Sequence, residues 1–345
     1  MRRIRSRRGS SGFCNYMIIV RVPLRVSFMG GGSDLPAFYE QFPGRVISVA
    51  IDKYVFVAIN EKFDGKFRIG YSVTELVDKP HEVKNTRVRA ALEHFGVEKG
   101  LEIVSISDVP SSGSGLGASS SFSVALMHAL GEFLGKPHAD KYAVAEAACH
   151  LEMGMLGEKI GKQDQYAAAF GGVNVIDFSA KGVKVSPVRA SKKLLADFNS
   201  HLIAFHIAGA RDAAAILSGV SHKLKNDAAT LAAQKKMVDM VIPFKEALLK
   251  KEFKKLGTML DKAWELKKKS HAMAHKEVDE VYAAGRTAGA WGGKLLGAGG
   301  GGFMLFMAPP KAHAKIRAAF KGRKELSIGF DHEGSKVIFS RTQAV

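Results

Sequence analysis

Hydrophobic and polar residues alternate in the first long segment of the chain. Val22, Leu24 and Val26 point to one side of an extended backbone, while Arg25 and Ser27 point to the other. A period of two residues is typical of a strand that buries one face. The same alternation predicts two further strands, at residues 45–51 and 54–60. The chain therefore begins with a sheet that has one polar face.

Strands and helices follow one another along the rest of the chain. Apolar runs predict strands at residues 101–107, 173–177, 183–188, 202–207 and 303–308, and near Leu326 and Val337. Helical spacing predicts helices at residues 85–95, 119–134 and 141–156, long helices up to about residue 288, and one after Pro310. A polar stretch at residues 190–200 is the best candidate boundary. This order predicts an α+β protein of two domains, at residues 17–192 and 193–345.

Composition places the chain among globular proteins. Of its 345 residues, 46% are hydrophobic and 24% are charged, which argues against disorder. No uncharged apolar run approaches the roughly 20 residues that a membrane-spanning helix needs. The two cysteines, Cys14 and Cys149, lack metal-ligand spacing. We therefore expect a soluble protein of a reducing compartment, the cytoplasm, without a membrane partner.

The net charge of +18 suggests a nucleic-acid partner, but its distribution argues otherwise. Residues 1–16 hold five arginines and no acid, so we expect either a disordered basic extension or a translation start placed too early, with Met17 as the true start. The lysines of residues 245–269 alternate with apolar residues at helical spacing, which predicts solvated helix faces. A basic nucleic-acid-binding protein remains an alternative that salt-sensitive RNA binding would support.

The strongest chemical motif is a glycine- and serine-rich segment between the strand at residues 101–107 and an apolar-periodic helix. Glycines bring backbone N–H groups close to an anion, and the first turn of a helix offers unpaired donors. The spacing matches neither a Walker loop nor the dinucleotide-binding fingerprint. We predict a phosphate-binding loop rather than a flexible linker. Its expected contacts are Pro110, Ser112, Gly113, Ser114, Gly115, Leu116, Gly117, Ala118, Ser119 and Ser120.

Three further motifs combine glycines with charged residues. Arg25 is followed by the run Gly30-Gly31-Gly32-Ser33-Asp34, in which Asp34 either serves a cleft or caps the helix that follows it. Glu152 on a helix precedes Asp164 by twelve residues, a pair that could serve a metal and a substrate hydroxyl. The glycines at residues 297–302, just before a strand, indicate a second close backbone approach.

Together these motifs resemble the GHMP kinase superfamily over residues 17–345, which implies two domains, one like the second domain of ribosomal protein S5 and one ferredoxin-like. The resemblance implies that ATP binds the glycine loop and that Mg²⁺ binds Ser119 and Glu152, with Glu158 as the alternative ligand. It also implies that Asp164 is catalytic with Arg25 beside it. The implied sugar contacts are Gly31, Gly32, Ser33, Asp34, Gly299 and Gly300.

Within the superfamily, residues 22–57 and 161–178 are similar to the D-glycero-D-manno-heptose 7-phosphate kinases. That resemblance implies transfer of the γ-phosphoryl group of ATP to the anomeric hydroxyl, giving the 1,7-bisphosphate for nucleotide-activated heptose synthesis. Candidates for binding the substrate's phosphate are Lys84, Arg87 and Arg211, of which Arg211, between a strand and a helix, is the first choice. The alternatives are an unphosphorylated sugar of the fucose or galactose type, and a protein that only senses a sugar. We expect a monomer or a homodimer.

Overall fold

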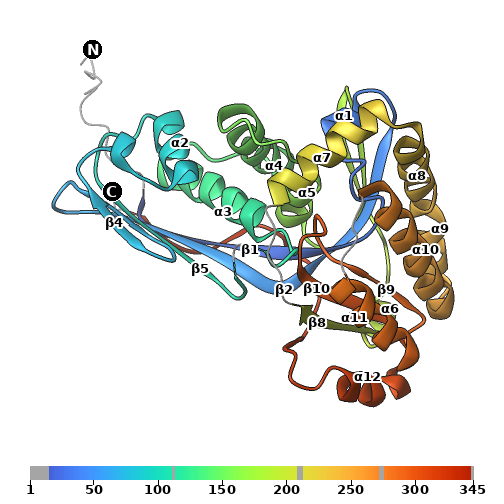
Figure 1. The fold of residues 1–345 in the computed structure, drawn as a ribbon. Coiled ribbons are helices and arrows are strands. Elements are labelled where there is room, and N and C mark those ends of the chain that lie inside the picture. Colours follow the sequence, from blue (N-terminus) through green and yellow to red (C-terminus); the bar gives the residue numbers. More distant parts are fainter. Residues whose placement is uncertain (1–14, 111–112, 208–212, 272–275, 343–345) are drawn as a thin grey trace, which may run out of the picture.

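A computed structural model describes residues 15–110, 113–207, 213–271 and 276–342 of the chain. Two sheets dominate the fold (Figure 1). The larger sheet has the order β12-β1-β2-β5-β3-β4, and β6 joins it by pairing with β2 and β7. Its strands are β1 (Asn15–Met29), β2 (Gly44–Glu61), β3 (Phe67–Gly70), β4 (Thr74–Val77), β5 (Leu101–Ser107), β6 (Val173–Ser179), β7 (Gly182–Pro187) and β12 (Lys336–Thr342).

The predicted pair of strands at residues 45–51 and 54–60 is one continuous strand, β2. On the facing strand β1, Pro23 pairs with Tyr54 and the next residue, Leu24, pairs with Ile51. Residues 52 and 53 are therefore extra on the β2 side and form a bulge, which sequence alternation cannot distinguish from a turn. The bulge bends the sheet and leaves the chain extended.

Four helices cover one face of the larger sheet (Figure 1). They are α2 (Thr86–Phe95), α3 (Ala118–Phe133), α4 (Lys141–Cys149) and α5 (Gln163–Phe170). The Asn85 side chain caps α2 by accepting from the Val88 amide at 3.2 Å. The helix predicted to continue to residue 156 changes character after Cys149, because His150–Met155 is a π-helix. Such wide turns occur often at functional sites.

The second half of the chain forms a four-stranded antiparallel sheet with the order β11-β8-β10-β9. Its strands are β8 (Leu202–Ile207), β9 (Gly292–Leu295), β10 (Gly302–Met307) and β11 (Glu325–Leu326). The helices are α6 (Lys192–Asn199), α7 (Ala213–Asn226), α8 (Ala228–Asp239), α9 (Val241–Leu249), α10 (Phe253–His271), α11 (Lys276–Thr287) and α12 (His313–Ala319). Short helical turns are α1 (Pro36–Tyr39), Pro80–Glu82 and Pro310–Ala312.

The two halves share a hydrophobic core, and the last strand of the chain joins the sheet of the first half. A continuous cluster of buried residues runs from Phe28 on β1 through Phe244 on α9 to Leu305 on β10. The last strand, β12, crosses back and pairs with β1 of the first half. The polar stretch at residues 190–200 holds α6, which buries Leu194 and Phe198. The fold is thus the two-domain α+β architecture that the sequence predicts. None of the helices in the described ranges is long and apolar enough to cross a membrane.

Candidate active site

The motifs that the sequence singles out surround one cavity of about 470 Å³. The cavity lies where β1, the start of α3, the π-helix, the start of α5 and the elements α10 and β9 of the second half converge. Predicted site residues that line it are Arg25, Gly31, Gly32, Asp34, Gly113, Ser114, Gly115, Gly117, Ala118, Ser119, Ser120, Glu152 and Asp164. The alternative ligand Glu158 and Gly297 of the second glycine loop line it too.

Some predicted residues do not line this cavity. Ser33 is fully buried, and its hydroxyl exchanges hydrogen bonds with the backbone of Arg45 at 2.9 and 3.0 Å. Leu116 is part of the hydrophobic core. Pro110, Gly299 and Gly300 lie on the adjoining loops. Ser112 and Arg211 fall outside the described residues.

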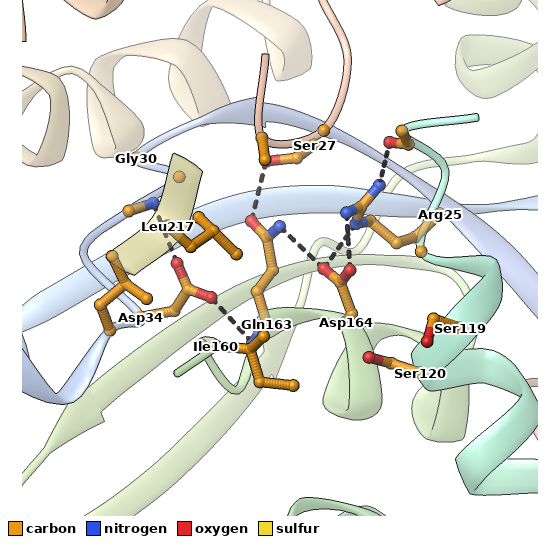
Figure 2. A pocket seen from close by; sticks show the side chains of 18 of the residues that line it. Arg25, Ser27, Gly30, Asp34, Ser119, Ser120, Ile160, Gln163, Asp164 and Leu217 are labelled. Carbon is orange, nitrogen blue, oxygen red and sulfur yellow. Dashed lines mark hydrogen bonds and ion pairs between the residues drawn. The ribbon is translucent and has the colours of Figure 1, made fainter. Parts of the chain in front are cut away.

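Arg25 and Asp164 form the central ion pair of the cavity, as Figure 2 shows. Arg25 Nε and Nη2 each donate to one oxygen of the Asp164 carboxylate at 2.7 Å, and Arg25 Nη1 donates to the Gly115 carbonyl at 2.6 Å. The fork of a guanidinium matches a carboxylate in this bidentate way. The Arg25 side chain is 6% exposed and Asp164 is 24% exposed. The pair therefore fixes a carboxylate beside the first glycine loop while leaving it open to a ligand.

Two residues that sequence reasoning missed extend this pair. The Ser27 hydroxyl donates to the Gln163 side-chain oxygen at 2.8 Å, and Gln163 Nε2 donates to Asp164 at 3.3 Å. Ser27 follows Arg25 by two positions and so shares its face of β1, a signal that the alternation already contained. Figure 2 shows Gln163 and Asp164 side by side at the start of α5.

Asp34 joins the first motif to the segment that carries Asp164. One carboxylate oxygen of Asp34 accepts from the Gly32 amide at 2.9 Å, and the other accepts from the Gln163 amide at 3.1 Å. Asp34 thus serves the N-terminus of α5 and not the helix that follows it, α1, which has no side-chain cap. Burial and then the Asp164 charge raise the pKa of Asp34, against the effect of the two amides.

The two glycine loops pack directly against each other. Gly115 and Gly297 both have positive φ, of 72° and 74°. A β-carbon on Gly297 would lie 2.4 Å from Gly115 Cα, so side chains at this contact would push the loops apart. Gly117, with φ of 77°, sets the start of α3, and a β-carbon there would lie 3.1 Å from Asp164 Oδ2. The N-terminus of α3 therefore lies next to the Arg25–Asp164 pair.

Glu152 lies at the back of the cavity among hydrogen-bond donors. It is fully buried, and it accepts from Ser123 at 2.9 Å, Gln165 at 2.5 Å and Arg87 at 3.4 Å. Arg87 also pairs with Glu158 at 2.7 Å. Burial raises the pKa of Glu152, and the Arg87 charge and the two other donors partly offset that rise. The structure thus groups both candidate metal-ligand acids around Arg87, a residue that the sequence suggested only as a candidate for binding the substrate's phosphate.

Models of known families match both halves of the chain. The family model for the N-terminal domain of GHMP kinases matches residues 83–172, and the model for the C-terminal domain matches residues 244–324. The first range contains the glycine loop, Glu152 and Asp164, and the second contains the loop around Gly297. The chain belongs to the GHMP kinase family and is an ATP-dependent phosphotransferase.

Several proteins whose names specify a particular sugar are similar to this chain over nearly its whole length. It is 31% identical to the D-glycero-alpha-D-manno-heptose 7-phosphate kinase of Campylobacter jejuni, over 92% of this chain and 98% of that protein. It is 27% identical to the bifunctional fucokinase/GDP-fucose pyrophosphorylase of Arabidopsis thaliana, over 90% of this chain but 32% of that protein. A crystal structure of a D-glycero-D-manno-heptose 1-phosphate kinase from Bacteroides thetaiotaomicron superposes with a TM-score of 0.76 at 25% identity, covering 92% of this chain and 97% of that one.

Proposed function

We propose that this kinase transfers the γ-phosphoryl group of ATP to the anomeric hydroxyl of D-glycero-D-manno-heptose 7-phosphate, giving the 1,7-bisphosphate. The observation that carries the proposal is the 31% identity to a heptose 7-phosphate kinase along almost the full length of both proteins. The cavity supports it, because a bidentate Arg25–Asp164 pair stands beside a helix N-terminus that suits phosphates.

The glycine loop before α3 would bind the phosphates of ATP. The amides in the first turn of α3 have no partners within the helix, and the positive end of the helix dipole adds to their attraction for anions. Arg25 fixes the loop by its hydrogen bond to the Gly115 carbonyl. The same side chain therefore ties the position of the donor phosphates to that of Asp164.

Asp164 would hold the hydroxyl that attacks. Its carboxylate is positioned by Arg25 and Gln163 and remains partly exposed to the cavity. Phosphoryl transfer depends mainly on positioning and on stabilisation of charge, so a carboxylate that orients the hydroxyl and accepts its proton is sufficient. Asp34 would bind other sugar hydroxyls, since each of its oxygens accepts one amide and keeps a free lone pair.

The residues around Glu152 meet some of the requirements of a magnesium site. Ser119 and Glu152 line the same cavity and offer the oxygen ligands that Mg²⁺ prefers. Glu152 already accepts hydrogen bonds at both oxygens, so Arg87 would have to share its carboxylate with the ion. We propose that Ser119 and Glu152 hold the ion, with Glu158 as the alternative to Glu152. When bound, Mg²⁺ would neutralise charge on the β- and γ-phosphates.

A screen of acceptors tests the proposal. ADP release is measured with heptose 7-phosphate, heptose 1-phosphate, fucose and galactose, each at several concentrations. We expect the highest kcat/KM with heptose 7-phosphate. Asp164→Asn, the negative control, should lower turnover with it by about 100-fold or more while ATP still binds.

A free sugar as the preferred acceptor would refute the proposal and favour the alternative, a sugar kinase of the fucose or galactose type. The observation behind that alternative is the match of 90% of this chain to 32% of a bifunctional fucokinase/GDP-fucose pyrophosphorylase. Arg211→Ala provides a second comparison, because we propose that Arg211 contacts the substrate's phosphate. Its KM for heptose 7-phosphate should rise about tenfold, which corresponds to roughly 1.4 kcal/mol of binding.

A further inference from the structure

Two buried lysines from the second half of the chain reach into the cavity. Lys267 on α10 is 9% exposed and Lys294 on β9 is 7% exposed, and both line the cavity with Arg25. Lys267 Nζ donates to the Gly297 carbonyl at 2.6 Å, and Lys294 Nζ donates to the Phe28 carbonyl at 3.1 Å. Each ammonium group is therefore fixed to backbone next to the Arg25–Asp164 pair.

The partners of the two lysines show how close they lie to Arg25. Gly297, which accepts from Lys267, packs on Gly115, which accepts from Arg25. Phe28, which accepts from Lys294, follows Arg25 by three residues on β1. Burial and the Arg25 charge lower the pKa of Lys267 to about 8. Burial, and then the charges of Lys267 and Arg25, lower the pKa of Lys294 well below its usual value. Three cationic side chains thus act on one another in a confined space.

The position of Lys294 is costly without an anion. Moving its ammonium group out of water has a large free-energy cost, and one hydrogen bond to a carbonyl recovers only a part of it. Lys294 makes one hydrogen bond to the described residues, so an ammonium with three N–H donors has capacity for a ligand. The carboxylates that line the cavity already accept other donors: Asp34, Glu152, Glu158 and Asp164.

We propose that Lys267 and Lys294 bind the phosphoryl group while it passes from ATP to the acceptor. In this step the bond from the γ-phosphorus to the bridging oxygen breaks and leaves its electron pair on ADP. A bond forms from the acceptor oxygen to phosphorus, and the hydroxyl proton goes to Asp164. The transferring group carries negative charge on its outer oxygens, which preorganised cations in a water-poor site stabilise strongly.

The position of Lys267 favours binding of the transferring phosphoryl group over binding of another anionic group on the substrate. It donates to Gly297 at the contact with the loop that ends in α3, and Arg25 links that same contact to Asp164. The phosphoryl group has to cross between the loop and Asp164. This inference rests on the proposed roles of the glycine loop and Asp164, and it holds whichever sugar accepts the group.

The test compares Lys267→Met and Lys294→Met with Lys262→Met, a control that removes an exposed lysine from the same helix α10. Rapid-quench single turnovers measure the transfer step, and calorimetry measures binding of ADP with and without aluminium fluoride, a mimic of the group in transit. We expect both cavity variants to lose about 100-fold in transfer rate and about as much affinity for the ADP–fluoride complex. Binding of ADP alone and the melting temperature should stay close to those of the control.

Two results would overturn the proposal. If the variants raise KM only for the phosphorylated sugar and leave the transfer rate unchanged, the lysines bind the phosphate that the substrate already carries. If they lower the melting temperature but not the rate per folded molecule, the lysines only connect backbone segments.

Lys267→Arg keeps the test valid should the methionine variants fail to fold. Arg25, Asp164 and Lys294 face the same space as Lys267. The wild-type kcat/KM should fall as pH rises through the Lys267 pKa of about 8. Because Lys294 also titrates in this site, Lys267→Arg should remove only the part of the fall that belongs to Lys267. An alkaline profile unchanged from the wild type would contradict the assignment of Lys267.

Discussion

The contact between the two glycine loops allows a quantitative prediction from a single added methyl group. In Gly297→Ala, the β-carbon would lie 2.4 Å from Gly115 Cα, so the loops have to separate by about 1 Å to reach ordinary contact. Gly65→Ala is a matched control, because Gly65 has φ of 73° against 74° for Gly297 and a β-carbon there meets nothing within 4 Å. The two variants share the backbone cost of an alanine at positive φ and differ only in the contact.

The shared backbone cost is about 1–2 kcal/mol, reduced by roughly 0.4–1 kcal/mol because alanine restricts the unfolded chain. The forced contact at Gly297 adds about 1–3 kcal/mol, as for an overpacked core. A movement of about 1 Å also breaks the hydrogen bond from Arg25 to Gly115, now 2.6 Å, and such displacements can cost 100-fold in rate.

Urea unfolding and steady-state kinetics measure these effects. Gly65→Ala is expected to lose about 1 kcal/mol of unfolding free energy with unchanged kcat/KM for ATP. Gly297→Ala should lose about 2–4 kcal/mol and about 10- to 100-fold in kcat/KM for ATP. If Gly297→Ala behaves like the control in both measurements, the loops adapt without cost and the packing argument is wrong.

Three other predictions concern separate groups. Glu152→Gln should raise the Mg²⁺ concentration that gives half-maximal rate while Glu158→Gln does not, and the reverse result would move the ligand to Glu158. Burial lowers the pKa of His128 to about 4, so between pH 7 and pH 5 the unfolded state takes up a proton that the folded state does not. His128 should account for a fall of about 2 kcal/mol in unfolding free energy over that range, and His128→Gln should lose this contribution in urea titrations at both pH values. Burial raises the pKa of the Cys149 thiol, so a Cys14→Ser variant should react with a thiol reagent at pH 8 only after unfolding, and rapid labelling of the folded protein would contradict this.

Local patterns predicted most elements of the fold, because period and burial act within a few residues. The strand at residues 101–107 and the strand at residues 202–207 have the predicted bounds. β9 was missed since its sequence, Gly-Gly-Lys-Leu, has too little side chain for a periodic signal. The boundary region at residues 190–200 is polar on average, yet α6 places its few apolar residues on one buried face.

The site residues also divide into those that a local sequence motif reveals and those that only contacts between distant elements bring into the cavity. The motifs that carry Arg25 and Asp164 are visible because glycines and charged residues cluster in sequence. Lys267 belongs to a lysine-rich segment that the spacing predicted to be solvated, and for this residue the prediction was wrong. Helical periodicity indicates which face of a helix points away from the core. It does not reveal whether that face contacts water or a cavity shared with another element. Lys294 likewise acquires its partner from β1, far away in sequence.

The pairing of β12 with β1 has a consequence for how the protein is made. During synthesis β1 emerges first, and one of its edges stays unpaired until residues 336–342 have left the ribosome. An exposed strand edge is a template for association with other chains. Nascent chains stalled before residue 336 should therefore depend on chaperones and aggregate more readily than full-length ones. The first half of this kinase cannot complete its sheet by itself, so deletions near the carboxyl end should impair the folding of the ATP-binding half.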